Sequence, residues 1–201
     1  MSPIFDIIRG VFIPDKTIAI VTLLLLASGC TGTGLAPSGQ LHQPAPNVSL
    51  PALDDRQISL SQLKGKVVVL DFWATWCPPC REGFPHLQSL AANVDMAQRG
   101  LTVLAVNEEE KPAEIRAFLD QAHYSLTVVQ DSAGLAARAY GVSALPTTIV
   151  VGRDGLVQAV ISGWTPDTAH QIDDAVAHAL EAPAPGQVEA PVPSPVVVPI
   201  R

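Results

Sequence analysis

The stretch DFWATWCPPCREGFP, residues 71–85, contains two of the three cysteines of the chain, Cys77 and Cys80. It begins inside the Val-rich apolar run KVVVLDFWA, residues 66–74, which predicts a strand buried on both faces. After the second cysteine, apolar side chains recur at helical spacing as far as Gly100. We therefore expect the two cysteines at the junction between a buried strand and a helix.

The remaining chain alternates between strand patterns and helix patterns. In chain order we expect a strand, a helix, a strand, a short helix, a β-hairpin with an Asp-Gly turn and a last helix, over residues 101–107, 111–123, 126–131, 132–141, 147–163 and 165–182. A short hairpin is expected before them, at residues 48–63. This order predicts an α/β fold with a central mixed sheet, parallel at first and closed by an antiparallel hairpin, with helices on both faces.

The N-terminal part of the chain indicates export. The apolar run TIAIVTLLLLASGC, residues 17–30, is shorter than the roughly 20 apolar residues of a spanning helix and is typical of a secretion signal. It ends in small residues directly before Cys30, which resembles the lipobox of bacterial lipoproteins, where the signal is cut before a cysteine that carries lipid. An ordinary signal peptide and an uncleaved anchor helix are the alternatives, and the domain is exported in all three cases.

We expect four parts along the chain: a lipoprotein signal peptide at residues 1–29, a flexible tether at 30–47, one folded domain at 48–181 and a Pro-rich disordered tail at 182–201. The mature protein is then anchored to a membrane by lipid and faces the periplasm or the outer surface. The expected domain carries the whole net charge of −7 and contains no basic patch. Its composition therefore argues against nucleic acid as a partner.

The cysteine pair is better suited to reaction than to structure. If Cys30 carries lipid, Cys77 and Cys80 are the remaining thiols, and the loop that they close is too short to stabilise the fold much. A helix N-terminus stabilises the thiolate of the first cysteine, which can attack a disulfide of a partner. The second cysteine can then resolve the mixed disulfide. Pro78 and Pro79, which lie between them, stiffen the turn.

Metal binding is the other use of such a pair, as half of a zinc site. The chain has no second pair, and the downstream histidines show no ligand spacing to the motif: His86, His123, His170 and His178. The acidic run at residues 108–110 is expected to be a solvated first helical turn and not a metal site. We expect neither a metal nor a cofactor.

The string FWATWCPPC, followed after a β-α-β interval by ALPTTIVVGRDG, resembles the thioredoxin superfamily, and within it the membrane-tethered TlpA/ResA/CcmG-like disulfide reductases. The resemblance covers about residues 48–180 and implies a thioredoxin-like fold. It implies that Cys77 is the exposed nucleophile and Cys80 the buried resolving thiol. It also implies that Pro146 is the cis-proline that packs against the disulfide and presents backbone to a substrate chain.

The same resemblance implies roles for the residues around the cysteines and the cis-proline. Those expected to contact substrate are Trp76, Pro78, Pro79, Leu145 and Thr147. Two positions depart from the branch, because Asp71 stands where Asn is common and Gly83 stands where Glu is common. A desolvated carboxylate has a raised pKa suited to accepting the proton of the resolving thiol, so we expect Asp71 to be that proton acceptor. Glu82 is expected to be a surface charge.

These features predict an exported thiol-disulfide oxidoreductase that reduces protein disulfides, works as a monomer and receives electrons from a transmembrane donor. Cytochrome c maturation is the usual role in this branch, and extracytoplasmic redox homeostasis is the alternative role. Reduction is the direction that the resemblance favours, since the residues themselves fix neither the direction of electron flow nor the substrate. A peroxidase of the peroxiredoxin type is an alternative, but it would need Thr where the chain has Ala74. A redox-inactive or copper-handling module of the Sco kind is the second alternative, but its C-x-x-x-C motif does not fit.

Overall fold

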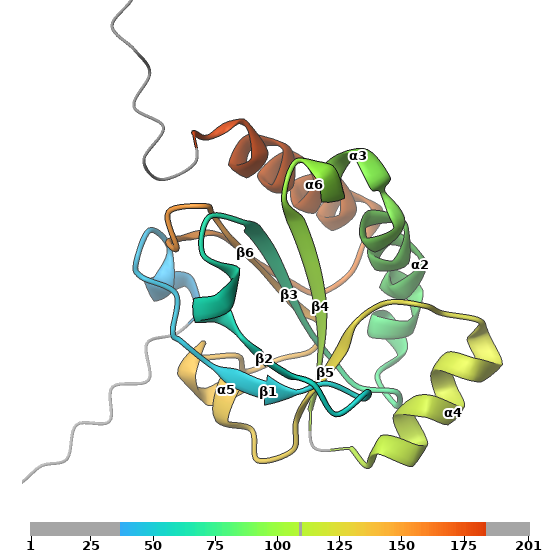
Figure 1. Cartoon of the computed structure of the whole chain (residues 1–201). Helices are drawn as coiled ribbons and strands as arrows, with labels where there is room; N and C mark the ends of the chain where they lie inside the picture. The colour runs from blue at the N-terminus through green and yellow to red at the C-terminus, as the bar shows by residue number, and fades with distance from the viewer. Residues whose placement is uncertain (1–36, 109, 184–201) are drawn as a thin grey trace, which may run out of the picture. The chain divides into compact units, whose positions relative to one another are not determined.

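Five strands form the central sheet of the computed structural model, which describes residues 37–108 and 110–183, all within the unit Gly34–Arg201 (Figure 1). The strands lie in the order β5-β4-β3-β6-β7. Their bounds are Val67–Trp73 for β3, Leu101–Glu108 for β4, Val128–Asp131 for β5, Thr147–Val151 for β6 and Val157–Ser162 for β7. β3, β4 and β5 are parallel, and β6 and β7 are antiparallel to their neighbours. The predicted mixed sheet with a closing hairpin is confirmed.

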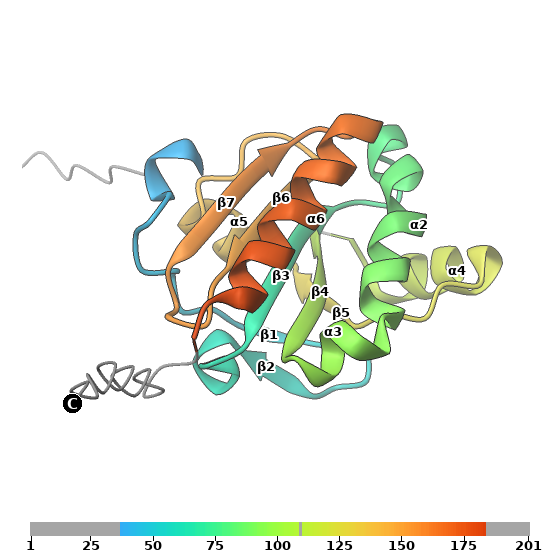
Figure 2. The same cartoon turned by 90° about the horizontal axis from the view of Figure 1, so that it is seen from above.

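Helices cover both faces of this sheet (Figure 2). One face packs against α2, Pro78–Ala92, α4, Pro112–Ala122, and α6, Pro166–Glu181. The other face packs against α5, Leu135–Ala139, and against the hairpin of β1, Ser49–Pro51, and β2, Gln57–Ser59. The elements α3, Val94–Gln98, η1, Pro37–Gln40, and η2, Leu60–Leu63, complete the described fold. The expected layers and the N-terminal hairpin are therefore present.

The central strand β3 explains where the site lies. All seven of its residues are buried, because neighbouring strands flank it and helices cover both faces. Side chains alternate between the two faces of a strand. Val67, Val69 and Trp73 contact the α2, α4 and α6 layer, so Asp71, which has the same parity, points toward the same layer. The chain leaves β3 at Trp73 and enters α2 at Pro78.

The helix expected up to Gly100 is divided in two. α2 ends at Ala92, and α3 begins at Val94. Asn93 between them starts the second helix, because its side-chain oxygen accepts a hydrogen bond from the backbone N–H of Met96 at 3.0 Å. Asparagine is among the preferred residues at a helix N-terminus, so its identity is the signal for the break.

The tether expected at residues 30–47 is too long, because its last part packs on the domain. The backbone N–H of His42 donates to the carbonyl of Val157 at 2.7 Å, and that of Val157 donates to Gln43 at 2.9 Å. Tyr140 donates from its hydroxyl to the carbonyl of Pro46 at 2.9 Å. Gln40 is buried and donates to a carbonyl of α5. The backbone groups at the start of β7 need partners, and this segment supplies them.

The predicted signal peptide, Cys30 and most of the Pro-rich tail lie outside the described residues, so these expectations stay predictions. Within residues 37–108 and 110–183, no helix is both long enough and apolar enough to cross a membrane.

Candidate active site

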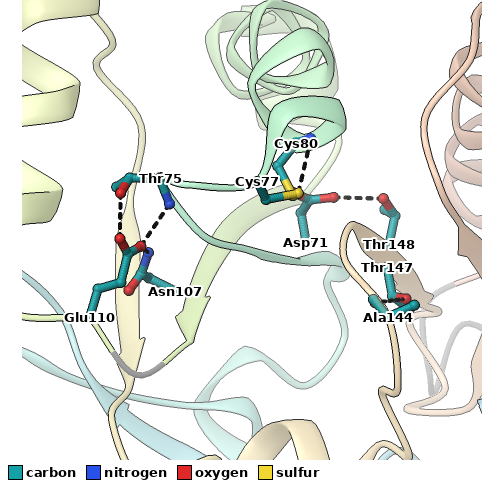
Figure 3. The surroundings of a disulfide bond; sticks show 9 residues. All are labelled: Asp71, Thr75, Cys77, Cys80, Asn107, Glu110, Ala144, Thr147 and Thr148. Carbon is teal, nitrogen blue, oxygen red and sulfur yellow. Dashed lines mark hydrogen bonds between the residues drawn. A yellow bond between two sulfur atoms is a disulfide. The ribbon is translucent and has the colours of Figure 1, made fainter.

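Cys77 and Cys80 form a disulfide at the N-terminus of α2, with an S–S distance of 2.06 Å (Figure 3). Cys77 is the N-cap residue, and its sulfur accepts a hydrogen bond from the backbone N–H of Cys80 at 3.3 Å. Pro78 and Pro79 form the start of the helix between them. The strand-to-helix junction predicted from the sequence therefore places the first sulfur against the N-terminal backbone groups of α2, where a thiolate is stabilised.

The expected difference in exposure between the two cysteines is not found in the disulfide form. Each of Cys77 and Cys80 is only 3% exposed, because the bond draws both sulfurs against the core. Their surroundings nevertheless differ. Cys77 borders an open groove of about 450 Å³, whereas Cys80 borders a small enclosed cavity beneath the disulfide. We call these the site groove and the inner cavity.

Most of the residues predicted to contact substrate line the site groove. Its walls are Trp76, Cys77, Pro78, Pro79, Glu108 and the loop at residues 142–145. Trp76 is 69% exposed, an unusual state for so large an apolar side chain, and it offers a contact surface beside the disulfide. Leu145 closes the groove next to the cis peptide bond that it forms with Pro146, so the expected cis-proline is present.

Thr147 does not line the groove, contrary to the prediction. It is buried at the start of β6, and its hydroxyl donates to the carbonyl of Ala144 at 2.8 Å (Figure 3). Thr147 therefore fixes the loop that forms one wall of the groove. Pro146 lines the inner cavity and lies on the Cys80 side of the disulfide.

Asp71 occupies the position that its parity on β3 predicts and lines the inner cavity with Cys80. It is 8% exposed. Burial raises the pKa of its carboxyl group to about 7, against a smaller opposite effect of Thr148, whose hydroxyl donates to the carboxylate at 2.7 Å. A carboxyl group with this pKa can both accept and release a proton at neutral pH.

The position of Trp164 explains why residue 83 is Gly and not the Glu that is common in the branch. A Cβ atom at Gly83 would lie only 2.7 Å from the ring of Trp164, which fills the space beside this turn of α2. A larger residue at this position would displace the ring. The indole of Trp164, from the loop before α6, thus fills the space that a Glu at position 83 would need. Gly83 and Trp164 both line the inner cavity.

Glu110 was missed by the sequence analysis. Its carboxylate accepts hydrogen bonds from the side-chain amide of Asn107 at 2.6 Å and from the backbone N–H of Thr75 at 2.7 Å (Figure 3). The hydroxyl of Thr75 donates to the same carboxylate. The expectation of a solvated turn is therefore wrong for this residue, which joins the end of β4 to the loop that precedes Cys77. In the part of the chain that the structure describes, no three His, Cys, Asp or Glu side chains are grouped to hold a metal ion.

A thioredoxin-like sheet, a Cys-x-x-Cys disulfide at a helix N-terminus and a cis-proline beside it define a thiol-disulfide oxidoreductase of the thioredoxin superfamily. Comparisons agree. Residues 41–160 match the AhpC/TSA family. The chain is 31% identical to thiol-disulfide oxidoreductase ResA of Bacillus cereus in an alignment 150 residues long, which covers 71% of this chain and 86% of that protein.

Two solved structures are similar to this one. A thiol:disulfide interchange protein of the thioredoxin family from Chlorobium tepidum is 30% identical, with a TM-score of 0.59 over 68% of this chain and 95% of that one. A secreted thiol-disulfide isomerase from Corynebacterium glutamicum is 26% identical, with a TM-score of 0.61 over 70% and 86%. The chain belongs to the AhpC/TSA family and, within the thioredoxin superfamily, is a ResA/CcmG-like thiol-disulfide oxidoreductase.

Proposed function

We propose that this protein reduces protein disulfides outside the cytoplasm while lipid on Cys30 holds it at a membrane. The observation that carries the proposal is the unequal placement of the two sulfurs: Cys77 borders the open site groove, and Cys80 borders the inner cavity with Asp71. This arrangement gives the two cysteines different partners. A substrate reaches the first sulfur, and a proton acceptor lies beside the second.

The reaction starts from the dithiol form. The thiolate of Cys77, stabilised by the N-terminus of α2, attacks one sulfur of the substrate disulfide, and the other substrate sulfur leaves as a thiolate. Cys80 then transfers its thiol proton to Asp71 and attacks the sulfur of Cys77. The substrate departs with both cysteines reduced, and the protein is left with the disulfide seen in the structure. A transmembrane electron donor returns it to the dithiol.

The site groove supports a protein substrate over a small molecule. It is open and long enough to pass from Trp76 across Cys77 to the loop at residues 142–145. The exposed ring of Trp76 offers apolar contact to any side chain of the substrate, so recognition depends little on sequence. Disulfides of cytochrome c precursors are the first substrates to test, because their reduction is the usual role of the branch that the chain resembles.

The proposed anchor keeps the site near the membrane. Only nine residues separate Cys30 from the buried Gln40, and a fully extended chain of this length spans at most about 35 Å. The domain is then held close to the membrane surface, and substrates and an electron donor at that surface are the accessible ones. The secreted relative from Corynebacterium glutamicum supports export.

The reduced full-length protein is expected to reduce insulin with dithiothreitol as electron source, because the groove accepts unrelated chains. Cys77→Ser should lower this activity to the rate of dithiothreitol alone, whereas His178→Ser, on the exposed side of α6, should not.

The direction of electron flow in cells is read by alkylating free thiols before electrophoresis. A mainly reduced protein supports a reductant, and a fully oxidised one would contradict that direction.

Cys30→Ala is expected to abolish membrane attachment, because the proposed lipid is carried by that sulfur. The variant should accumulate as uncleaved precursor or appear in the soluble fraction, while Cys77→Ser stays in the membrane fraction. Intact mass of the purified protein checks the claim directly. An N-terminus elsewhere, with a free thiol at Cys30, would show that an ordinary signal peptide is removed.

A further inference from the structure

The inner cavity contains a second titratable group, His86, besides Asp71 and Cys80. His86 lies on α2, and its Nε2 is 3.2 Å from Oδ1 of Asp173 on α6, within ion-pair range although not aligned as a hydrogen bond. The two helices lie side by side on the same face of the sheet (Figure 2). The ring centroids of Trp164 and His86 lie 5.6 Å apart, and the two ring planes are tilted by 43°. The proposed reaction does not involve the pair of His86 and Asp173.

Asp71 is buried and needs a route by which its proton reaches solvent, and His86 can provide that route. The proton that Asp71 takes from Cys80 must reach solvent before the next cycle, but Asp71 is buried and its hydrogen-bond partner Thr148 does not titrate at neutral pH. The remaining walls offer no titratable side chain: Gly83, Leu87, Pro146, Trp164 and Ile172. Among the described residues that line the cavity, His86 is thus the one other group able to exchange a proton near neutral pH.

The pair of His86 and Asp173 also spans the distance from cavity to solvent. The side chain of His86 is 21% exposed and that of Asp173 is 45% exposed. The free space in the cavity, about 10 Å³ for the centre of a water molecule, is roughly what one water needs. One water can therefore bridge the carboxyl group and the imidazole.

We propose that His86, paired with Asp173, exchanges the proton of Asp71 with solvent through the inner cavity and so acts on Cys80 through Asp71. It is a positioning residue for that proton and does not touch the substrate. The inference rests on the proposed function, because the proton in question is the one released when Cys80 resolves a mixed disulfide.

The proton balance closes without any further reactant. The thiol of Cys80 gives its proton to the carboxylate of Asp71. The carboxylic acid passes a proton through the bridging water to the neutral imidazole, which becomes an imidazolium beside the carboxylate of Asp173. The imidazolium releases the proton to bulk water. The acidic groups that face His86 are Asp71 from β3 and Asp173 from α6.

The test separates the attack by Cys77 from the resolution by Cys80. The reduced protein reacts with the aromatic disulfide DTNB and releases the coloured thiol twice, first when Cys77 attacks and again when Cys80 displaces the mixed disulfide. His86→Gln should leave the first phase unchanged and slow the second about tenfold at neutral pH, because an Asp71 that already holds a proton must lose it before Cys80 can react, and positioned proton transfer contributes at least that much. Added imidazole should restore part of the loss. The matched control His178→Gln should behave as the wild type.

Asp173→Asn gives a second readout that a merely structural pair would not move. Removing the counter-charge disfavours the imidazolium, so the pH at which the second phase becomes fast should shift downward. A second phase with the wild-type rate and pH profile in His86→Gln would overturn the relay while the function stands. A wild-type protein that releases no thiol in the first phase would overturn the function itself.

Discussion

Cys80→Ser is expected to accumulate partner proteins bound covalently to Cys77, the largest effect that any single substitution should have here. In the wild type the mixed disulfide lasts only until Cys80 attacks it. With a serine in that place the intermediate has no intramolecular exit, whereas Cys77 keeps its position at the N-terminus of α2 and still reacts. The measurement is non-reducing electrophoresis of the affinity-purified variant from cells, followed by mass spectrometry of the attached proteins.

Cys77→Ser is the matched control and should trap nothing, because the remaining thiol borders the inner cavity and not the groove. The reduced wild type should show the same asymmetry with iodoacetamide. Cys77 borders the open groove and its thiolate is stabilised by the N-terminus of α2, so it should be alkylated before Cys80. Equal alkylation of both cysteines, together with no trapped partner, would describe a static disulfide and refute the assignment.

Asp71→Asn is expected to slow resolution by about a hundredfold at neutral pH and to spare the first attack. The pKa of this carboxyl group is raised to about 7 by burial, so in the wild type the rate of resolution should rise with pH through that value as the acceptor ionises. The asparagine variant should lack this inflection, and its rate should rise only as Cys80 itself ionises at higher pH. Both phases of the DTNB reaction, followed from pH 6 to 9, check the prediction. Full turnover of the variant across this range would leave Asp71 a structural role only.

The same substitution should stabilise the oxidised protein in alkaline solution. The folded pKa of Asp71 lies above its unfolded value of 3.8, so the folded state binds the proton more tightly, and stability falls as pH rises from about 4 to about 7. The rise of about three pKa units corresponds to roughly 4 kcal/mol of unfolding free energy once the carboxyl group is ionised. Urea unfolding should show a gain for Asp71→Asn at pH 8 that is nearly absent at pH 4. A loss at pH 8 would contradict the direction of the pKa shift.

The part of the site that the sequence predicted is the part built by local pattern. The Val-rich run and the spacing of Cys77 and Cys80 predict the strand, the helix and the junction between them, and the resemblance to the thioredoxin superfamily adds the carboxyl group of Asp71 near the second cysteine. The junction needs only the period of a strand and the position of one helix. The structure adds the magnitude of burial, and with it the raised pKa of Asp71.

The part that the sequence could not predict comes from segments that meet only in the fold. Glu110 sits in an acidic run of the kind usually found in solvent, and only the return of β4 beside β3 brings it to Thr75. Trp164 and Asp173 lie 84 and 93 residues beyond Cys80, and neither belongs to a motif. Residues 40–46 resemble a linker in composition, because pairing with β7 uses backbone groups and requires no pattern of side chains.

The pairing of residues 42–45 with the start of β7 also affects how copies of this chain can contact one another. An open strand edge is a template for a strand of another chain, and proteins crowded on a surface meet edge to edge. Residues 42–45 pair with the turn before β7 and with its first residue, Val157, and at the opposite edge Leu53 donates to the carbonyl of Val128 on β5. The segment that leads to the proposed anchor thus also covers the start of the β7 edge, where a strand of a neighbouring copy could otherwise pair.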